Sequence, residues 1–222
     1  MEAAVVGAGI TGITTAYYLA KAGYFVTIYD ERRYPAMATS YANGGQLSAS
    51  NAEVWNSWTN VYKGLKWLSK SDAPLKINLW PSLDRYSWFF KFLKAIPNAE
   101  MNTQKTCEMA LEAHKLYKQI ADEEGIEFDK VERGILHIYT DKKEFENAKK
   151  VNKIYTKAGL KRWPVSPKEC LQIEPALVKS PRLLGGMYND TDFTGDIHKF
   201  CVELMRVLQE KYAVKCVRRK IR

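Results

Sequence analysis

The sequence predicts an α/β fold that begins with a strand–helix–strand unit. Three observations support this prediction. Residues 3–6 form a short apolar run typical of a buried strand, residues 14–22 carry apolar side chains at helical spacing, and residues 25–29 are rich in β-forming residues. Gly23 stands where a glycine commonly follows the end of a helix. The connection through one helix predicts that the two strands are parallel.

A glycine-rich turn joins the first strand to the helix. Gly7, Gly9 and Gly12 give the pattern G-x-G-x-x-G. The first glycine allows a tight turn, the second lets the backbone approach a pyrophosphate, and the third lets the helix pack closely on the strand. The N–H groups at the helix start then face the anion. We expect the pyrophosphate contacts from the turn and helix start: Gly7, Ala8, Gly9, Ile10, Thr11 and Gly12.

An acidic residue closes the second strand. The carboxylate of Asp30 is placed to accept hydrogen bonds from a ribose hydroxyl, and Glu31 takes this place if the strand shifts by one residue. Because Arg32 and Arg33 follow, NADP is not excluded as an alternative to NAD. Since strand, helix, second strand and acid are all present, the motif predicts dinucleotide binding. The alternative is a glycine-rich turn in another kind of α/β protein.

Composition and charge limit the class of protein. The chain has 222 residues, 46% hydrophobic and 27% charged, with a net charge of +9, which favours anionic partners such as a nucleotide, a phospholipid surface or nucleic acid. Its four widely spaced cysteines predict neither a disulfide framework nor a metal site. The uncharged run 3–20 contains three glycines and follows Glu2, so it predicts neither a signal peptide nor a membrane span. We therefore expect a cytoplasmic protein.

A second small-residue loop follows the nucleotide unit. Residues 31–53 are mostly polar, and a loop of this length inside a domain is usually functional. At its centre, glycines permit close backbone approach and short polar side chains offer hydrogen bonds. A flexible surface loop is the alternative. A second ligand-contacting loop favours FAD, with contacts to its phosphates or flavin ring from Asn43, Gly44, Gly45, Gln46 and Leu47.

Together with residues 7–12 and Asp30, the stretch Thr39–Ser48 resembles the flavin amine oxidoreductases of the DAO type, in particular the small, FAD-carrying subunits of bacterial D-amino acid dehydrogenases. Later stretches resemble the same family in the same order, from the N-terminus to about residue 218. They are residues 64–68, 73–75, 133–140, 169–177, 185–186 and 192–196.

The resemblance implies a Rossmann-like FAD-binding βαβ domain, incomplete here, with an inserted α+β substrate or cap domain. The implied division is 1–53 for the first FAD-binding segment, 54–182 for a partial cap, and 183–222 for the return to the FAD-binding domain. The strand at 213–217 is expected beside the first strand. Family members continue for about as long again, so this chain is interpreted as an N-terminal half, either a fragment or a truncated gene product. Supply of the missing C-terminal half by another chain is one possibility.

The implied activity is oxidation of a D-amino acid to an imino acid, by hydride transfer from Cα to flavin N5. Hydrolysis then gives a 2-oxo acid and ammonia, and the electrons pass to a respiratory acceptor. Alternatives are a non-catalytic flavoprotein fragment and another DAO-type oxidase that acts on glycine or sarcosine.

Residues 54–98 hold five of the six tryptophans, interleaved with lysine and arginine. The favoured interpretation is amphipathic helices that bury these aromatic side chains in the core. The alternatives are a peripheral membrane surface, on the inner face of the cell membrane, and nucleic-acid binding, which no recognised module supports.

No convincing acid–base set is present, and we name no catalytic residue. His114 lies on the apolar face of a helix predicted at 103–124 and is interpreted as structural. His137 lies on a predicted strand, and the alternation of side chains along that strand does not determine whether His137 points toward a substrate cavity. The segment 192–196 lacks the remaining ligands of a calcium loop, and Asp196 is predicted to cap the helix 197–211.

Overall fold

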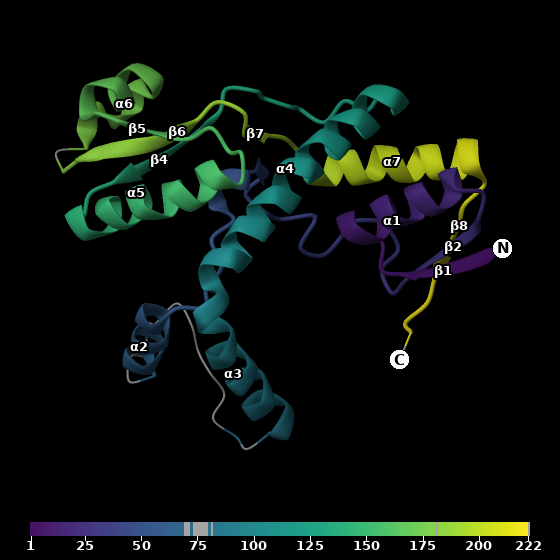
Figure 1. Cartoon of the computed structure of the whole chain (residues 1–222). Coiled ribbons are helices and arrows are strands. Elements are labelled where there is room, and N and C mark those ends of the chain that lie inside the picture. Colours follow the sequence, from purple (N-terminus) through teal and green to yellow (C-terminus); the bar gives the residue numbers. More distant parts are fainter. Residues whose placement is uncertain (69–71, 73–79, 81, 181, 222) are drawn as a thin grey trace. The chain divides into compact units, whose positions relative to one another are not determined.

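The computed structural model describes residues 1–68, 72, 80, 82–180 and 182–221. These residues divide into two compact units (Figure 1). The first comprises Met1–Leu47, Ala113–Ile135 and Asp190–Arg222, and the second comprises Ser48–Glu112 and Leu136–Asn189. The domain boundaries inferred from the family resemblance stay a prediction, and its stretch 73–75 lies outside the described residues.

A parallel sheet forms the base of the first unit. Its order is β1 (Glu2–Val6), β2 (Phe25–Asp30) and β8 (Lys215–Arg218), with β2 in the middle. Ala4 pairs with Thr27, and Ile28 pairs with Cys216. The expectation that the last strand lies beside the first is therefore wrong. The chain returns along α7 and adds its last strand to the far edge of β2.

Two helices cover one face of this sheet (Figure 1): α1 (Ile10–Lys21) and α7 (Ile197–Tyr212). Their apolar sides and the inward side chains of β1 and β2 form the core, which includes Ile13, Val26, Ile28, Phe200 and Leu204. As predicted, Gly23 follows α1 with a φ of +85°. Asp196 caps α7, since its Oδ1 accepts a hydrogen bond from the Lys199 N–H at 2.9 Å.

The long helix α4 (Ala99–Glu124) contributes its last part to the first unit. There Glu124 accepts hydrogen bonds from the hydroxyl of Tyr17 at 2.8 Å and of Tyr212 at 3.2 Å. The ammonium group of Lys211 lies 2.8 Å from the same carboxylate. Burial and these acidic neighbours raise the pKa of Tyr17. The carboxylate of Glu124 thus joins α1 to the C-terminal ends of α4 and α7.

A short antiparallel pair completes the first unit. It consists of β3 (Gln46–Leu47) and β7 (Phe193–Thr194), with Gln46 opposite Thr194. The pair connects the loop after β2 with the segment that precedes α7.

The second unit contains a three-stranded sheet of order β4 (Ile135–Tyr139), β6 (Gly185–Asn189) and β5 (Trp163–Val165). Two helices accompany it, α5 (Lys142–Lys157) and α6 (Pro167–Ile173), and a capping box begins α6. Three 3₁₀ segments are present in the described part of the chain: η1 (Ala49–Asn51), η2 (Ile96–Asn98) and η3 (Pro175–Lys179).

The aromatic-rich region forms α2 (Trp58–Trp67) and α3 (Leu83–Ala95). Serine side chains cap both helices, but neither helix has a buried residue. The interpretation that these helices bury their aromatic side chains is therefore wrong for α2 and α3. Trp58, Tyr62, Trp88 and Phe90 are all exposed.

Candidate nucleotide-binding site

The glycine turn opens the N-terminus of α1 to an anion. Gly7 has a φ of +100°, and its N–H donates to the carbonyl of Tyr29 at 2.8 Å, which closes the turn against β2. Gly9 is the N-cap of α1 and supplies no side-chain cap, and the first turn carries no acidic residue. The N–H groups of this turn and the positive end of the helix dipole therefore favour a phosphate.

Gly12 sets the distance between helix and turn. A Cβ atom at this position would lie 1.9 Å from the carbonyl oxygen of Gly7. Because that neighbour is backbone, no side-chain movement could relieve the overlap. At Gly9 the same test gives 3.3 Å to the hydroxyl of Ser40. The predicted role of Gly12 in close packing is confirmed.

Asp30 is bound to the glycine turn itself. Its Oδ2 accepts a hydrogen bond from the Ala8 N–H at 2.8 Å, and its Oδ1 accepts one from the Arg32 N–H at 2.7 Å. Each carboxylate oxygen has two lone pairs, so capacity remains for a ribose hydroxyl. Glu31 is directed elsewhere, since its carboxylate lies 3.6 Å from both Arg32 Nη1 and Lys220 Nζ. The ribose contact of Asp30 or Glu31 stays a prediction.

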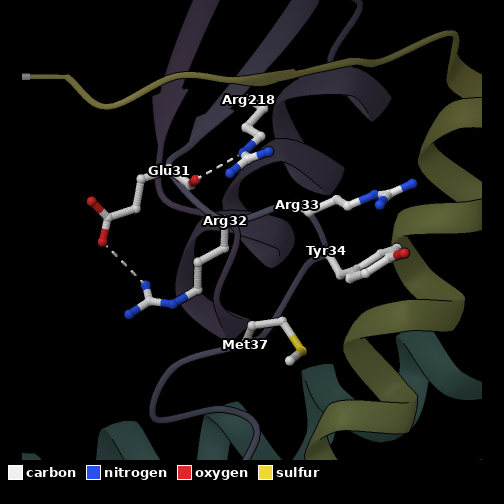
Figure 2. A pocket seen from close by; sticks show the side chains of 6 residues that line it. All are labelled: Glu31, Arg32, Arg33, Tyr34, Met37 and Arg218. Carbon is white, nitrogen blue, oxygen red and sulfur yellow. Dashed lines mark hydrogen bonds and ion pairs between the residues drawn. The ribbon is translucent and has the colours of Figure 1, made fainter.

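An open pocket lies just beyond Asp30 (Figure 2). It encloses about 490 Å³ and is lined by Glu31, Arg32, Arg33, Tyr34, Met37 and Arg218. The Nε of Arg218 donates to the carbonyl oxygen of Glu31 at 3.3 Å, which ties β8 to the segment after β2. Arg33 lies over the ring of Tyr34. The pocket combines positive charge with planar and apolar surface, which suits the adenosine end of a dinucleotide.

The second loop predicted to contact FAD is shaped by Asn43. Its Nδ2 donates to the carbonyls of Thr39 and Ser40, both at 3.2 Å, and its Oδ1 accepts from the Gly45 N–H at 2.8 Å. The Asn43 amide thus holds the loop, whereas the side chain of Gln46 is exposed. Gly45 has a φ of +60°, and a Cβ there would lie 2.8 Å from the carbonyl of Gly195. Gly45 thus lies close to the backbone of Gly195, whereas Gly44 has open space around it. The contacts of both glycines with FAD stay a prediction.

Ser40 joins the second loop to the glycine turn. Its Oγ accepts a hydrogen bond from the Ile10 N–H at 3.1 Å. Nearby, the Ala36 N–H donates to the carbonyl of Ala8 at 2.8 Å, and Ala36 has a φ of 58°. The loop thus folds back over the helix start. We did not select Ser40 from the sequence, and its only signal was a small hydroxyl residue shortly before the glycine pair.

The half-buried His114 lies next to the end of the second loop. His114 Nδ1 lies 3.9 Å from Asp192 Oδ1, with 12% and 0% of the two side chains exposed. Burial lowers the pKa of His114, while Asp192 and a hydrogen bond with the backbone of Leu47 oppose this shift. His114 therefore supports β3, and it is half-buried as the sequence predicts.

The second unit contains another serine–histidine contact. Ser50 Oγ lies 2.8 Å from His137 Nε2 and 3.1 Å from Ser48 Oγ. The buried guanidinium of Arg162 donates to the carbonyl of Ser50 at 3.4 Å and to the hydroxyl of Tyr139 at 3.1 Å. These bonds hold the segment that follows the second loop.

In the described residues, no group of three or more His, Cys, Asp or Glu could hold a metal ion. No described helix is long and apolar enough to cross a membrane.

The parallel sheet, the glycine turn and the acid at the end of β2 define a Rossmann-like dinucleotide-binding protein of the α/β class. The chain belongs to the DAO family of FAD-dependent oxidoreductases, whose sequence pattern matches residues 2–221. The chain is 51% identical over 209 residues to D-amino acid dehydrogenase 3 of Mesorhizobium japonicum, covering 94% of this chain and 50% of that protein. It is 42% identical over 217 residues to D-amino acid dehydrogenase of Paramagnetospirillum magneticum, covering 95% and 51%.

Solved structures share the fold at low sequence identity. Glycine oxidase from Geobacillus kaustophilus is 20% identical with a TM-score of 0.65, covering 96% of this chain and 45% of that chain. L-proline dehydrogenase from P. horikoshii has the same identity and TM-score, covering 96% and 42%. The chain thus spans about half the length of the relatives that it matches.

The residues present fit the FAD of this family. The start of α1 offers backbone N–H donors, has no side-chain cap from Gly9 and carries no acidic residue in its first turn. Asp30 stands at the end of β2 with acceptor capacity, and the pocket beyond it has the volume and charge for an adenosine.

Proposed function

We propose that this chain is the FAD-binding half of a D-amino acid dehydrogenase. The observation that carries the proposal is the glycine turn bonded to Asp30 within a chain that is 51% identical to a protein of that name. The substrate class is a D-amino acid, and the product is a 2-oxo acid with release of ammonia. When bound, FAD supplies the hydride acceptor for the substrate Cα–H bond.

The residues of this chain would bind and orient the cofactor. Within the turn from Gly7 to Gly12, the N–H groups of Gly9, Thr11 and Gly12 would hold the pyrophosphate, since those of Gly7, Ala8 and Ile10 already donate within the protein. Asp30 would accept hydrogen bonds from the ribose. The loop that Asn43 and Ser40 fix would place Gly44, Gly45, Gln46 and Leu47 along the phosphates or flavin ring. No residue is assigned a proton transfer, and the electron acceptor is proposed to be respiratory.

Flavin retention tests the proposal directly. Purified chain should retain or take up FAD, measured by visible flavin absorbance and by quenching of flavin fluorescence. Gly12→Ala should abolish this binding, because the added Cβ overlaps the backbone of Gly7. Asp30→Asn should weaken it, because the amide cannot accept all the bonds that the carboxylate accepts.

Gly64→Ala is the matched control, since Gly64 lies on α2 and its added Cβ would have no neighbour within 4 Å. Equal flavin content in the Gly12→Ala and Gly64→Ala proteins, both folded by circular dichroism, would contradict the assignment.

The substrate class has two alternatives. An oxidase acting on glycine or sarcosine would reduce its flavin with those substrates and produce hydrogen peroxide, whereas the proposed dehydrogenase would respond to D-amino acids and reduce a quinone analogue. A non-catalytic fragment would bind FAD and leave it oxidised with every substrate.

We also propose that α2 and α3 bring the protein to an anionic membrane surface. Exposed tryptophan and tyrosine side chains on these helices alternate with Lys63, Lys66, Lys91 and Lys94. Aromatic rings of this kind favour the lipid headgroup region, and lysines favour anionic lipid.

Co-sedimentation with phosphatidylglycerol vesicles should be strong at low salt and weak with phosphatidylcholine vesicles. Trp58→Ser should reduce it, whereas Trp163→Ser, outside the two helices, should not. Sedimentation that is insensitive to lipid charge and to Trp58→Ser would exclude this surface.

A further inference from the structure

The loop predicted to contact FAD ends in the short strand pair β3–β7. Leu47 lies opposite Phe193, and next to this pair the Gly195 N–H donates to the carbonyl oxygen of Gly45 at 2.9 Å. A two-stranded pair is marginally stable by itself, and each strand here has only two residues. The position of the end of the loop therefore depends on the side chains that pack against the pair.

Two side chains of α4 pack against this pair. The imidazole of His114 lies edge-on to the ring of Phe193, with the ring centroids 5.3 Å apart, and its Nδ1 lies 3.9 Å from Asp192 Oδ1. Lys118 lies one turn further along the same helix face and places its ammonium nitrogen 4.8 Å from the centroid of the same Phe193 ring. Phe193 and Asp192 are both fully buried. This face of α4 thus fixes β7, which in turn pairs with β3.

The charged groups that face the imidazole act in opposite directions. Asp192, just before β7, and a hydrogen bond with the backbone of Leu47 favour the protonated ring, whereas Lys118 on α4 favours the neutral ring. The Lys118 ammonium is itself paired with Glu132 at 2.5 Å, and β3 and β7 consist of uncharged residues. Burial has the largest effect and lowers the pKa of His114. The packed arrangement therefore favours the neutral ring.

We propose that His114 is a positioning residue for the cofactor. In its neutral form it holds the β3–β7 pair against α4 and so fixes the end of the loop that contacts FAD, and protonation of the ring releases that end. The role in cofactor binding rests on the proposed function, whereas the coupling between the ring and the loop rests on the packing alone.

The direction of the pH dependence follows from burial. Once the loop is released, the ring is open to solvent and its pKa returns toward the ordinary value of 6.5, above the pKa of the packed ring. The contribution of the neutral ring is therefore complete above about pH 6.5 and is lost as the pH falls through the pKa of the packed ring. Because FAD binds the packed loop, its affinity should fall over the same interval, by about tenfold per pH unit at most for one proton.

The test measures the loop and the cofactor separately in the full 222-residue chain. Without flavin, amide exchange followed by NMR should show that the protection factor of the Gly195 amide falls between about pH 7.5 and about pH 5. The Gly7 amide, which donates to Tyr29 in the glycine turn, should keep its protection. FAD affinity, measured by quenching of flavin fluorescence, should fall by about tenfold over this range, with the same midpoint as the Gly195 protection.

Two variants connect these changes to the imidazole. His114→Phe keeps a ring against Phe193 and removes both ring nitrogens, so the pH dependence of both measurements should disappear. Lys118→Met removes the positive charge beside the imidazole, so the shared midpoint should move upward toward pH 6.5. A purely structural role of either side chain would leave the midpoint in place.

Two further variants are the matched controls, and both should leave the midpoint unchanged. Lys105→Met removes an exposed lysine of the same helix that is not among the charged groups acting on His114. His198→Phe removes the other histidine of the first unit, which lies edge-on to Tyr41 in the same loop.

Three results would overturn the proposal. They are a pH dependence that persists in His114→Phe, a midpoint that Lys118→Met leaves in place, and an FAD affinity that stays constant while the Gly195 protection falls. The Lys118→Met result decides the matter even where His114→Phe does not fold. A chain that binds no FAD at any pH, but whose Gly195 protection follows the titration of His114, would contradict the proposed function and leave the coupling between the ring and the loop standing.

Discussion

Ser40 is a single residue on which the geometry of the candidate site depends. Ser40 is 9% exposed, and its hydroxyl oxygen accepts a hydrogen bond from the Ile10 N–H at the start of α1. We expect Ser40→Ala to lower the free energy of unfolding by about 1 kcal/mol, because the partly buried Ile10 N–H loses its hydrogen-bond partner. Urea denaturation of the flavin-free chain measures this. Ser87→Ala is the control: Ser87 is exposed on α3, and alanine there should leave stability unchanged or slightly higher.

His114 makes the stability of the first unit depend on pH. Burial lowers its pKa below the ordinary value of 6.5, so the unfolded chain binds a proton more readily than the folded one. Its stabilising contribution is therefore complete above about pH 6.5 and is lost as the pH falls toward the folded-state pKa. An NMR titration of the imidazole should place the His114 midpoint below 6.5. In His114→Gln this part of the acid dependence of unfolding should disappear, and a midpoint at or above 6.5 would contradict the burial argument.

Among single residues, the sequence predicts those that a local backbone turn requires. Gly7, Gly12 and Asp30 follow from the spacing of one βαβ unit, and the structure places them in one turn. Ser40 and Ala36 contact that turn across many residues of loop. Contacts of this kind depend on the path of the loop, which no periodicity encodes.

At the scale of elements, α7 has the clearest local signal. Asp196 precedes its apolar face and accepts the Lys199 N–H, as an N-cap residue does. We expect Asp196→Ala to lower the free energy of unfolding by about 1 kcal/mol, since an orphan N–H and a favourable charge at the positive end of the helix are both lost. Asp122→Ala, at an exposed position on α4, should change stability much less. Equal losses in thermal unfolding would show that the cap is not the cause.

The sequence predicts wrongly the burial of α2 and α3 and the position of β8, because both depend on the elements that pack beside them. The helical pattern of α2 and α3 is local and is present, but their exposure depends on what packs against them. In the same way, β8 has the composition of a strand, yet its place beside β2 is set by the path of α7. Local composition predicts the element, and the tertiary partner decides its position.

At the scale of the whole chain, the two units do not follow the sequence as blocks. Residues 113–135 belong to the first unit although they lie within the stretch predicted as cap. The reason is physical, because Ile120, Ala121 and Phe128 pack in the same core as α1 and α7. Such an exchange depends on tertiary contacts, which the local sequence does not show.

The reactivity of the four cysteines tests whether both units are folded, because each unit contains two of them. In the described residues they form no disulfide; Cys107, Cys170 and Cys201 are buried, and Cys216 is exposed. Burial raises the pKa of Cys201 to about 12, so its thiolate is scarce even at mildly alkaline pH. We expect a thiol reagent to modify one cysteine of the folded chain quickly and the other three only as denaturant unfolds it. Cys216→Ser should remove the fast phase, and a fast phase of two or more thiols would show that one unit opens in the native protein.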